Sequence, residues 1–201
     1  GPAAHRTGWS TRAALALAGA LGRRGRRVLL ADLGLEDPTL HDAADVPNLE
    51  GLADVFLFGT RLADVGRPLD PAGLLLFVPA GAYVPDPAGA LADPRWESLL
   101  AEIAADGRTL LAYAPTDTPG LDALARRAAA AILAAAPDEE AGALAALPPA
   151  VRVLAVLGPA RAAPAEPRAP DLREPVFVRP ARRHARRPLL GLALAGAGAA
   201  V

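Results

Sequence analysis

The 201-residue sequence contains no lysine, no cysteine and no methionine, and only 4% of its residues are aromatic. The absence of cysteine excludes disulfide bonds and cysteine-ligated metal sites, and it is compatible with a cytoplasmic protein. The three histidines, at positions 5, 41 and 184, do not have the spacing of metal ligands. All 21 basic residues are arginine, yet the net charge is −1. The chain therefore has no overall attraction for nucleic acid, and we predict no nucleic-acid partner.

Although aromatic residues are scarce, 52% of the residues are hydrophobic and the mean hydropathy is +0.25. Much of this comes from alanine, so the value does not by itself indicate a membrane protein. A GC-rich genome also encodes arginine in place of lysine, together with much alanine, glycine and proline. The abundance of arginine alone therefore indicates no function. A chain of 201 residues can bury one sizeable core and still carry a tail.

Apolar runs typical of buried parallel strands alternate with helical patterns over most of the chain. We expect strands at 28–32, 74–78, 109–113, 131–134 and 151–157. We expect helices at 10–21, 51–58, 62–65, 96–105 and 121–130. This alternation predicts an α/β fold with a mainly parallel sheet flanked by helices. The predicted domain spans residues 1–157.

The composition changes after residue 157. Residues 158–187 are rich in proline, alanine and arginine, which predicts a disordered linker. The linker ends in an arginine cluster, and residues 188–201 are uncharged and mostly apolar. We interpret this last segment as the start of a transmembrane helix, because the positive-inside rule places such clusters on the cytoplasmic side. The alternative is a buried or interfacial helix, since a spanning helix needs roughly 20 apolar residues.

The first helical pattern follows Gly8, Trp9, Ser10 and Thr11. A glycine-rich loop that ends in Gly-Lys-Ser/Thr before a helix is the P-loop of nucleotide-binding proteins. Its lysine reaches the β- and γ-phosphates, and its hydroxyl holds Mg²⁺. A P-loop follows a buried strand, and the sequence places none before Gly1. We therefore expect the sequence to be a fragment that is cut at both ends, which would also hide a signal peptide.

Five segments in order resemble the MinD/ParA-like P-loop ATPases, and within them the cytoplasmic domain of bacterial tyrosine kinases and polysaccharide chain-length regulators. The segments are 8–11, 28–38, 51–55, 76–87 and 109–115, and together they cover roughly residues 1–136. In the family these places hold Gly-Lys-Ser-Thr, a strand with an Asp-x-Asp motif, a Gly-Leu helix start, a Pro-x-Gly…Pro-x-Pro loop and the Walker B strand. The resemblance implies the family's α/β fold and a nucleotide site at the loop.

Four positions depart from the family pattern. Trp9 replaces the Walker lysine, and the family's additional lysine falls at or near Ala4. Gly34 replaces the second aspartate of Asp-x-Asp, and Tyr113 stands where the Walker B aspartate would organise water around Mg²⁺. An indole carries no charge and is bulky, so these changes predict that triphosphate binding is lost.

The resemblance leaves a vestigial nucleotide site of Arg6, Gly8, Trp9, Ser10, Thr11 and Asp32. Ser10 and Asp32 are the candidate Mg²⁺ ligands. Asp117, in a displaced Asp-Thr-Pro, is an alternative acidic group, although such a residue is also typical of a helix cap. Arg6 is the candidate substitute for the lysine, since guanidinium binds phosphate well, but it is also typical of a solvated residue.

We therefore predict a catalytically degenerate domain that is more a binding module than an enzyme, with no cofactor and no catalytic residue. The resemblance implies a bacterial protein on the cytoplasmic face of the inner membrane, with a role in cell-envelope or polysaccharide assembly. We expect an unidentified protein partner, and the family's assemblies suggest a homo-oligomer. The alternatives are an active ATPase or kinase that retains ATP and Mg²⁺, or a membrane scaffold whose activity lies beyond Val201.

Overall fold

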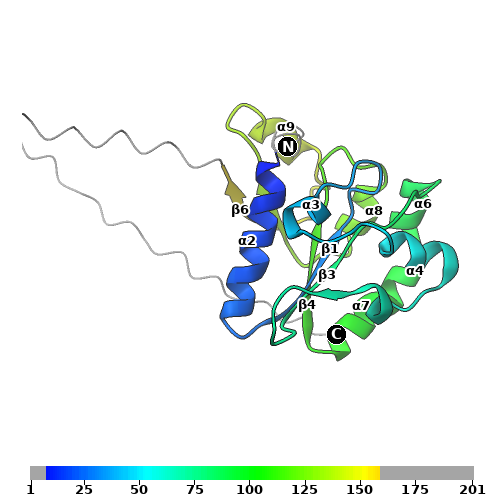
Figure 1. Ribbon diagram of the computed structural model, residues 1–201. Coiled ribbons are helices and arrows are strands. Elements are labelled where there is room, and N and C mark those ends of the chain that lie inside the picture. The colour runs from blue at the N-terminus through cyan, green and yellow to red at the C-terminus, as the bar shows by residue number, and fades with distance from the viewer. Residues whose placement is uncertain (1–7, 159–201) are drawn as a thin grey trace, which may run out of the picture. The chain divides into compact units, whose positions relative to one another are not determined.

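Three parallel strands form the centre of the main sheet (Figure 1). Strand β1 (Arg27–Asp32) lies between β3 (Leu75–Val78) and β4 (Arg108–Tyr113). The short strand β2 (Arg67–Pro68) pairs with β3 in the antiparallel direction, which gives the order β2-β3-β1-β4. The computed structural model describes residues 8–158. Arg6, the arginine cluster and the apolar C-terminal segment lie outside the described residues.

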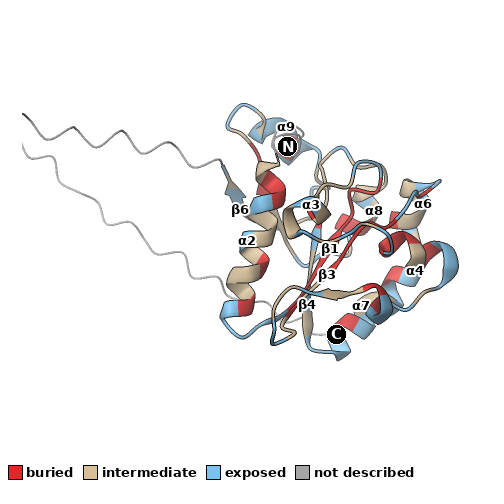
Figure 2. Cartoon of the chain, viewed as in Figure 1, coloured by how far each residue is buried: buried red, intermediate tan, exposed pale blue. Residues whose placement is uncertain are grey.

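Strand β1 is apolar because helices cover both of its faces. All of its residues except the first are buried, and their side chains alternate between two cores. Leu29 and Ala31 belong to one core, and Val28 and Leu30 belong to the other. A continuous apolar run, in place of an alternating one, is the expected pattern for a parallel strand in this position. Figure 2 shows β1 and β3 as a buried band inside the domain.

Two helices cover one face of the sheet. They are α2 (Trp9–Arg23) and α3 (Leu40–Ala44), whose residues Ala18 and Leu40 are completely buried. Five helices contribute to the core on the other face: α4 (Leu52–Phe58), α5 (Leu62–Val65), α6 (Pro87–Ala92), α7 (Arg95–Ala105) and α8 (Leu121–Ala125). Trp96 of α7 anchors this second core, and its indole N–H donates to the carbonyl of Ala90 (2.9 Å). The predicted α/β fold with a mainly parallel sheet is confirmed.

A second, smaller sheet completes the described part of the chain. Strands β5 (Ala131–Ala134) and β6 (Val153–Leu157) are parallel, and α9 (Glu140–Ala145) lies between them in sequence. This unit has a small core of its own, in which Leu133 packs with Ala135 and Ala143. On β6, Leu154 and Val156 remain exposed.

The expected elements differ from the observed ones mainly in short helices. The helix expected at 121–130 ends at Ala125, because the chain turns through residues 126–128 and enters β5 at Ala131. Helix α6 begins inside what the sequence presents as a proline-rich loop. Its N-terminus is fixed by Pro87 at the first turn and by Asp86, whose carboxylate accepts the Gly89 N–H (2.8 Å). Helices α3 and α9 and strand β2 were also not predicted.

The start of a transmembrane helix is predicted for residues 188–201, which lie outside the described residues. Within residues 8–158, no helix combines the length and the apolar character needed to cross a bilayer.

Candidate functional site

The candidate site lies where α2 begins. Gly8, directly before the helix, has φ +65°, a left-handed conformation that glycine adopts without strain. The carbonyl oxygen of Gly8 accepts the Thr11 hydroxyl (2.8 Å) and the Arg12 backbone N–H (3.3 Å). These two bonds fold the glycine onto the first turn of the helix. Gly8 therefore turns the backbone into a helix N-terminus, the place where phosphate binds in P-loop proteins.

The residue at the lysine position does not restore the lost charge. Trp9 is the first residue of α2 and is half-buried. A cation does lie close by, because a β-carbon placed on Gly8 would come 3.2 Å from Nη1 of Arg12. Arg12 is thus the basic residue that the described structure places beside the glycine. Arg6, the substitute that the sequence suggests, lies outside the described residues.

A buried hydrogen bond joins the two positions at which the resemblance places Mg²⁺-binding groups. The hydroxyls of Ser10 on α2 and Tyr113 at the end of β4 are 2.8 Å apart. The pKa of Tyr113 is raised to about 12: burial raises it most, the Ser10 hydrogen bond lowers it, and the charges of Asp32 and Asp37 add to the rise. The phenol is therefore neutral at pH 7. An aspartate at this position would bring a negative charge, which the tyrosine does not supply.

Asp32, the surviving acidic residue, has both carboxylate oxygens engaged by the backbone. Its Oδ1 accepts the Gly34 N–H (3.0 Å), and its Oδ2 accepts the N–H of Leu40, the first residue of α3 (3.1 Å). The side chain is completely buried. The carboxylate therefore closes the loop after β1 and satisfies a free N–H at the start of α3.

The loop after β1 is packed closely around Gly34. A β-carbon at this position would lie 3.2 Å from Oδ1 of Asp32 and 3.2 Å from the carbonyl oxygen of Asp37. Any side chain would push against both groups, so the loop leaves little room for the second aspartate of the Asp-x-Asp motif. The loss of that aspartate is thus accompanied by a compact, internally bonded loop.

The fold brings Ser10, Asp32 and Tyr113 together from three separate elements. Asp32 and Tyr113 are register partners at the carboxyl ends of β1 and β4, and the Leu33 N–H donates to the Tyr113 carbonyl (2.7 Å). Asp117 is exposed, in the turn that follows β4. Within residues 8–158, no group of three or more His, Asp or Glu side chains has the arrangement of a metal site.

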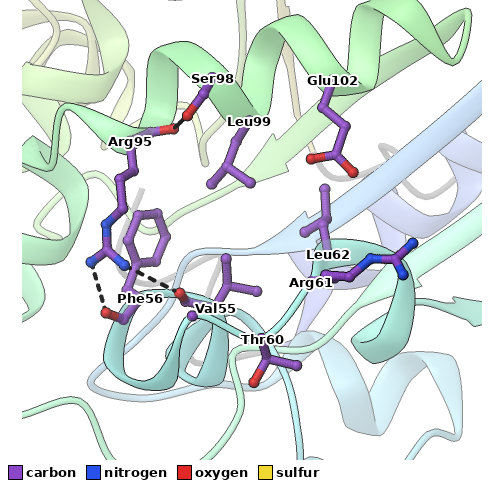
Figure 3. Close-up of a pocket in the computed structure, with 10 residues that line it drawn as sticks. Val55, Phe56, Thr60, Arg61, Leu62, Arg95, Ser98, Leu99 and Glu102 are labelled. Carbon is purple, nitrogen blue, oxygen red and sulfur yellow. Dashed lines mark hydrogen bonds between the residues drawn. The ribbon is translucent and has the colours of Figure 1, made fainter.

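A separate pocket of about 230 Å³ lies between α4–α5 and α7 (Figure 3). Apolar side chains line its floor, among them Val55, Leu62 and Leu99. Arg95 lies at one side and donates hydrogen bonds to the carbonyls of Val55 (3.4 Å) and Phe56 (2.7 Å), so that it caps the end of α4. None of the predicted site residues lines this pocket. Of its two arginines, Arg61 and Arg95, the second is hydrogen-bonded to the carbonyls of α4.

Sequence reasoning found the residues of the site but not their interactions. Asp32, Ser10 and Thr11 are signalled by motif spacing. The Ser10–Tyr113 bond joins residues 103 positions apart, and no sequence pattern indicates it. The proximity of Arg12 to Gly8 follows from helix geometry, since residues four apart lie on one face of a helix.

Several solved structures that are similar to this chain are kinase domains. The VpsO kinase domain matches with a TM-score of 0.58 at 19% identity, over 72% of this chain and 73% of that one. The kinase domain of the Escherichia coli tyrosine kinase Etk matches with a TM-score of 0.61 at 18% identity, over 75% of this chain and 61% of that one. The BceF tyrosine kinase domain matches with a TM-score of 0.58 at 23% identity, over 73% of this chain and 62% of that one.

These matches confirm the resemblance at the level of the fold: the chain has the fold of bacterial tyrosine-kinase domains. No protein-family model and no curated protein sequence matches the chain.

Proposed function

We propose that this chain is a catalytically degenerate relative of the bacterial tyrosine-kinase domains and acts as a membrane-tethered interaction module. The observation that carries the proposal is the buried hydrogen bond between Ser10 and Tyr113. It pairs the candidate Mg²⁺ ligand of the loop with a neutral phenol at the place of the Walker B carboxylate.

The electrostatics of the site support the loss of catalysis. Phosphoryl transfer requires positive charge around the γ-phosphate and a well-held Mg²⁺. Trp9 brings no charge to the lysine position, and Tyr113 is neutral because its pKa is raised to about 12. Both carboxylate oxygens of Asp32 accept hydrogen bonds from backbone N–H groups. Mg²⁺ would have to compete with these N–H groups for the lone pairs of the carboxylate, which would weaken the binding of Mg-ATP.

The place and process of the module are proposed from the sequence. The arginine cluster and the apolar segment 188–201 support attachment to the inner membrane from the cytoplasmic side. A role in cell-envelope or polysaccharide assembly is taken from the family resemblance, since a fold does not fix a function. The partner is proposed to be a protein, which includes a second copy of this chain.

A second candidate is an active ATPase or kinase that uses Arg6, Ser10, Asp32 and Asp117. The position of Arg12 beside Gly8 is the observation that favours it, because a guanidinium can bind phosphate oxygens in place of an ammonium. A third candidate is a membrane scaffold whose activity lies beyond Val201, and the sequence of a longer chain would test it.

Calorimetric titration of the full chain with Mg-ATP distinguishes the first two candidates. We expect no saturable binding at micromolar nucleotide. Binding at micromolar Mg-ATP that is abolished by Ser10→Ala but retained in Asp117→Ala would refute the degenerate site. Loss of binding in both variants would instead support the active site that includes Asp117. Thermal unfolding of each variant controls for loss of the fold.

A reversion variant adds a positive test. Trp9→Lys combined with Tyr113→Asp returns the ammonium and the carboxylate to the family positions. We expect this double variant to bind Mg-ATP more tightly than either single variant, because the two changes restore different halves of one site.

A further inference from the structure

The turn between α2 and β1 carries a dense group of arginines. Arg23, Arg24, Arg26 and Arg27 occupy four of five consecutive positions, and all four are exposed. Gly25, the remaining residue, has φ +77° and reverses the chain between the helix and the strand. In Figure 2 this turn is part of the exposed surface at the end of α2. We name these four residues the arginine turn.

Neighbouring carboxylates neutralise only part of the positive charge of the arginine turn. Arg27 is paired with Asp106 (2.9 Å), and Asp106 is also paired with Arg108 (2.6 Å). One carboxylate therefore serves two arginines. Arg23, Arg24 and Arg26 form no ion pair with any of residues 8–158. The turn thus keeps a strong positive charge in the folded domain.

The dipole of α2 explains some of these residues and not the others. A basic residue in the last turn of a helix is favourable, and Arg23 and Arg24 stand at that place. The effect is confined to the last turn, so Arg26 gains little from it. Each further arginine also repels its neighbours. A cluster of this density is therefore suited to a surface that is itself densely negative.

The position of the turn leaves the candidate nucleotide site free. The turn lies at the amino ends of the parallel strands, whereas Ser10 meets Tyr113 at their carboxyl ends. Helix α2 separates the two ends, and its 15 residues span about 22 Å. A surface bound at the arginine turn would not cover the loop at Gly8 (Figure 1).

We propose that the arginine turn binds the anionic headgroups of a phospholipid surface. Guanidinium groups match the geometry of phosphate and carboxylate oxygens, and a polybasic segment gains attraction from each residue near an anionic leaflet. A nucleic acid is the less suitable partner, since proteins that bind single strands interleave basic and aromatic side chains. The exposed aromatic residues of the described domain, Phe58 and Tyr83, lie on other elements.

Vesicle binding of the full chain tests this proposal. The probe is a vesicle of phosphatidylcholine mixed with phosphatidylserine, compared with phosphatidylcholine alone. The variant R23Q/R24Q/R26Q removes the unpaired charges of the turn. The control R61Q/R126Q/R152Q removes the same number of exposed arginines from other elements. Both variants keep the C-terminal arginine cluster, so its contribution to binding is equal in the two.

We expect the turn variant to need about a hundredfold more anionic lipid for half-maximal binding, since three residues that each contribute about 1 kcal/mol near an anionic leaflet are lost. In the control variant, the lipid concentration for half-maximal binding should change by less than a factor of two. Binding to vesicles of phosphatidylcholine alone should be the same for both variants and the unsubstituted chain. Equal shifts in both variants, or no shift in either, would overturn the proposal. A shift in binding of duplex DNA without a shift for vesicles would overturn the assignment to lipid.

The proposal is independent of the degenerate nucleotide site. A Mg-ATP titration reports on the loop at Gly8, and vesicle binding reports on the opposite end of α2. Each experiment can therefore fail while the other succeeds. Thermal unfolding of R23Q/R24Q/R26Q measures what these arginines contribute to the helix end, so a loss of stability is not mistaken for a loss of lipid binding.

Discussion

Tyr113 and Ser10 share a buried hydrogen bond of 2.8 Å that joins the end of β4 to the first turn of α2. The bond connects a strand to a helix at the edge of the sheet where nucleotides bind in domains of this fold. It makes the two residues a structural pair and ties the start of α2 to the sheet. Substitutions at these two residues can therefore show how much the pair contributes to the stability of the domain and how much to ligand binding.

Removal of the phenolic hydroxyl should destabilise the domain. Tyr113→Phe leaves the Ser10 hydroxyl buried without this partner, which we expect to cost about 1 kcal/mol of unfolding free energy. Urea unfolding followed by circular dichroism measures the change. In a double-mutant cycle with Ser10→Ala, the second substitution should cost much less once the first is present. Additive losses would show that the bond contributes nothing of its own.

The stability of the domain should fall at alkaline pH. The pKa of Tyr113 is raised from its ordinary value of 10 to about 12, so the folded state holds the phenolic proton more tightly than the unfolded state does. The resulting stability is complete below pH 10 and is lost as the pH rises towards 12, by about 2 kcal/mol. Unfolding free energies measured across this range, in the natural chain and in Tyr113→Phe, should converge and then cross as the pH rises, because the variant starts about 1 kcal/mol lower and has no phenol to ionise at this position.

Few other side chains of this sequence ionise in the alkaline range, which simplifies the experiment. The chain has no lysine and no cysteine, and its tyrosines are Tyr83 and Tyr113. A Tyr83→Phe background leaves Tyr113 as the one phenol whose ionisation is followed by ultraviolet absorbance. A pH dependence that persists unchanged in Tyr113→Phe would contradict the assignment.

Asp32 should be more important for folding than for metal binding. In Asp32→Asn, one carboxylate oxygen becomes an NH₂ group, which then faces a backbone N–H and cannot accept from it. We expect a loss of about 1–3 kcal/mol in unfolding free energy, because a buried donor is left unsatisfied. Asp117→Asn, in an exposed turn, is the matched control and should change stability by less than about 0.5 kcal/mol. A neutral Asp32→Asn variant would show that the two backbone bonds are dispensable.

Two glycines should respond to alanine in opposite directions. Gly8 has φ +65°, so Gly8→Ala should destabilise the domain by about 1 kcal/mol. Gly142 lies inside α9, and a β-carbon there would meet no atom within 4 Å. Gly142→Ala should therefore stabilise the domain by about 0.5–1 kcal/mol through helix propensity. Thermal unfolding of the two variants checks both signs, and the same sign in both would contradict the argument.

The strands of the main sheet could be predicted because burial on both faces imposes a continuous apolar run. Residues 28–32 and 109–113 fall within one residue of β1 and β4 at either end. The shorter helices could not be predicted with the same accuracy. Helix α6 depends on the Asp86 cap inside a proline-rich stretch, and α8 stops early because the next strand begins at Ala131. Such ends are decided by local hydrogen bonds and by the space between neighbouring elements.

The sequence by itself determined the α/β fold, the place of the loop at Gly8 and the absence of a lysine from it. These follow from local patterns, because periodicity and motif spacing are properties of neighbouring residues. Only the tertiary structure decided that Tyr113 bonds to Ser10 and that both oxygens of Asp32 are engaged. The first of these contacts joins residues that are distant in sequence, and the others depend on how the chain folds back upon itself. Their geometry is fixed by the packing of helices on the sheet, which no local pattern records.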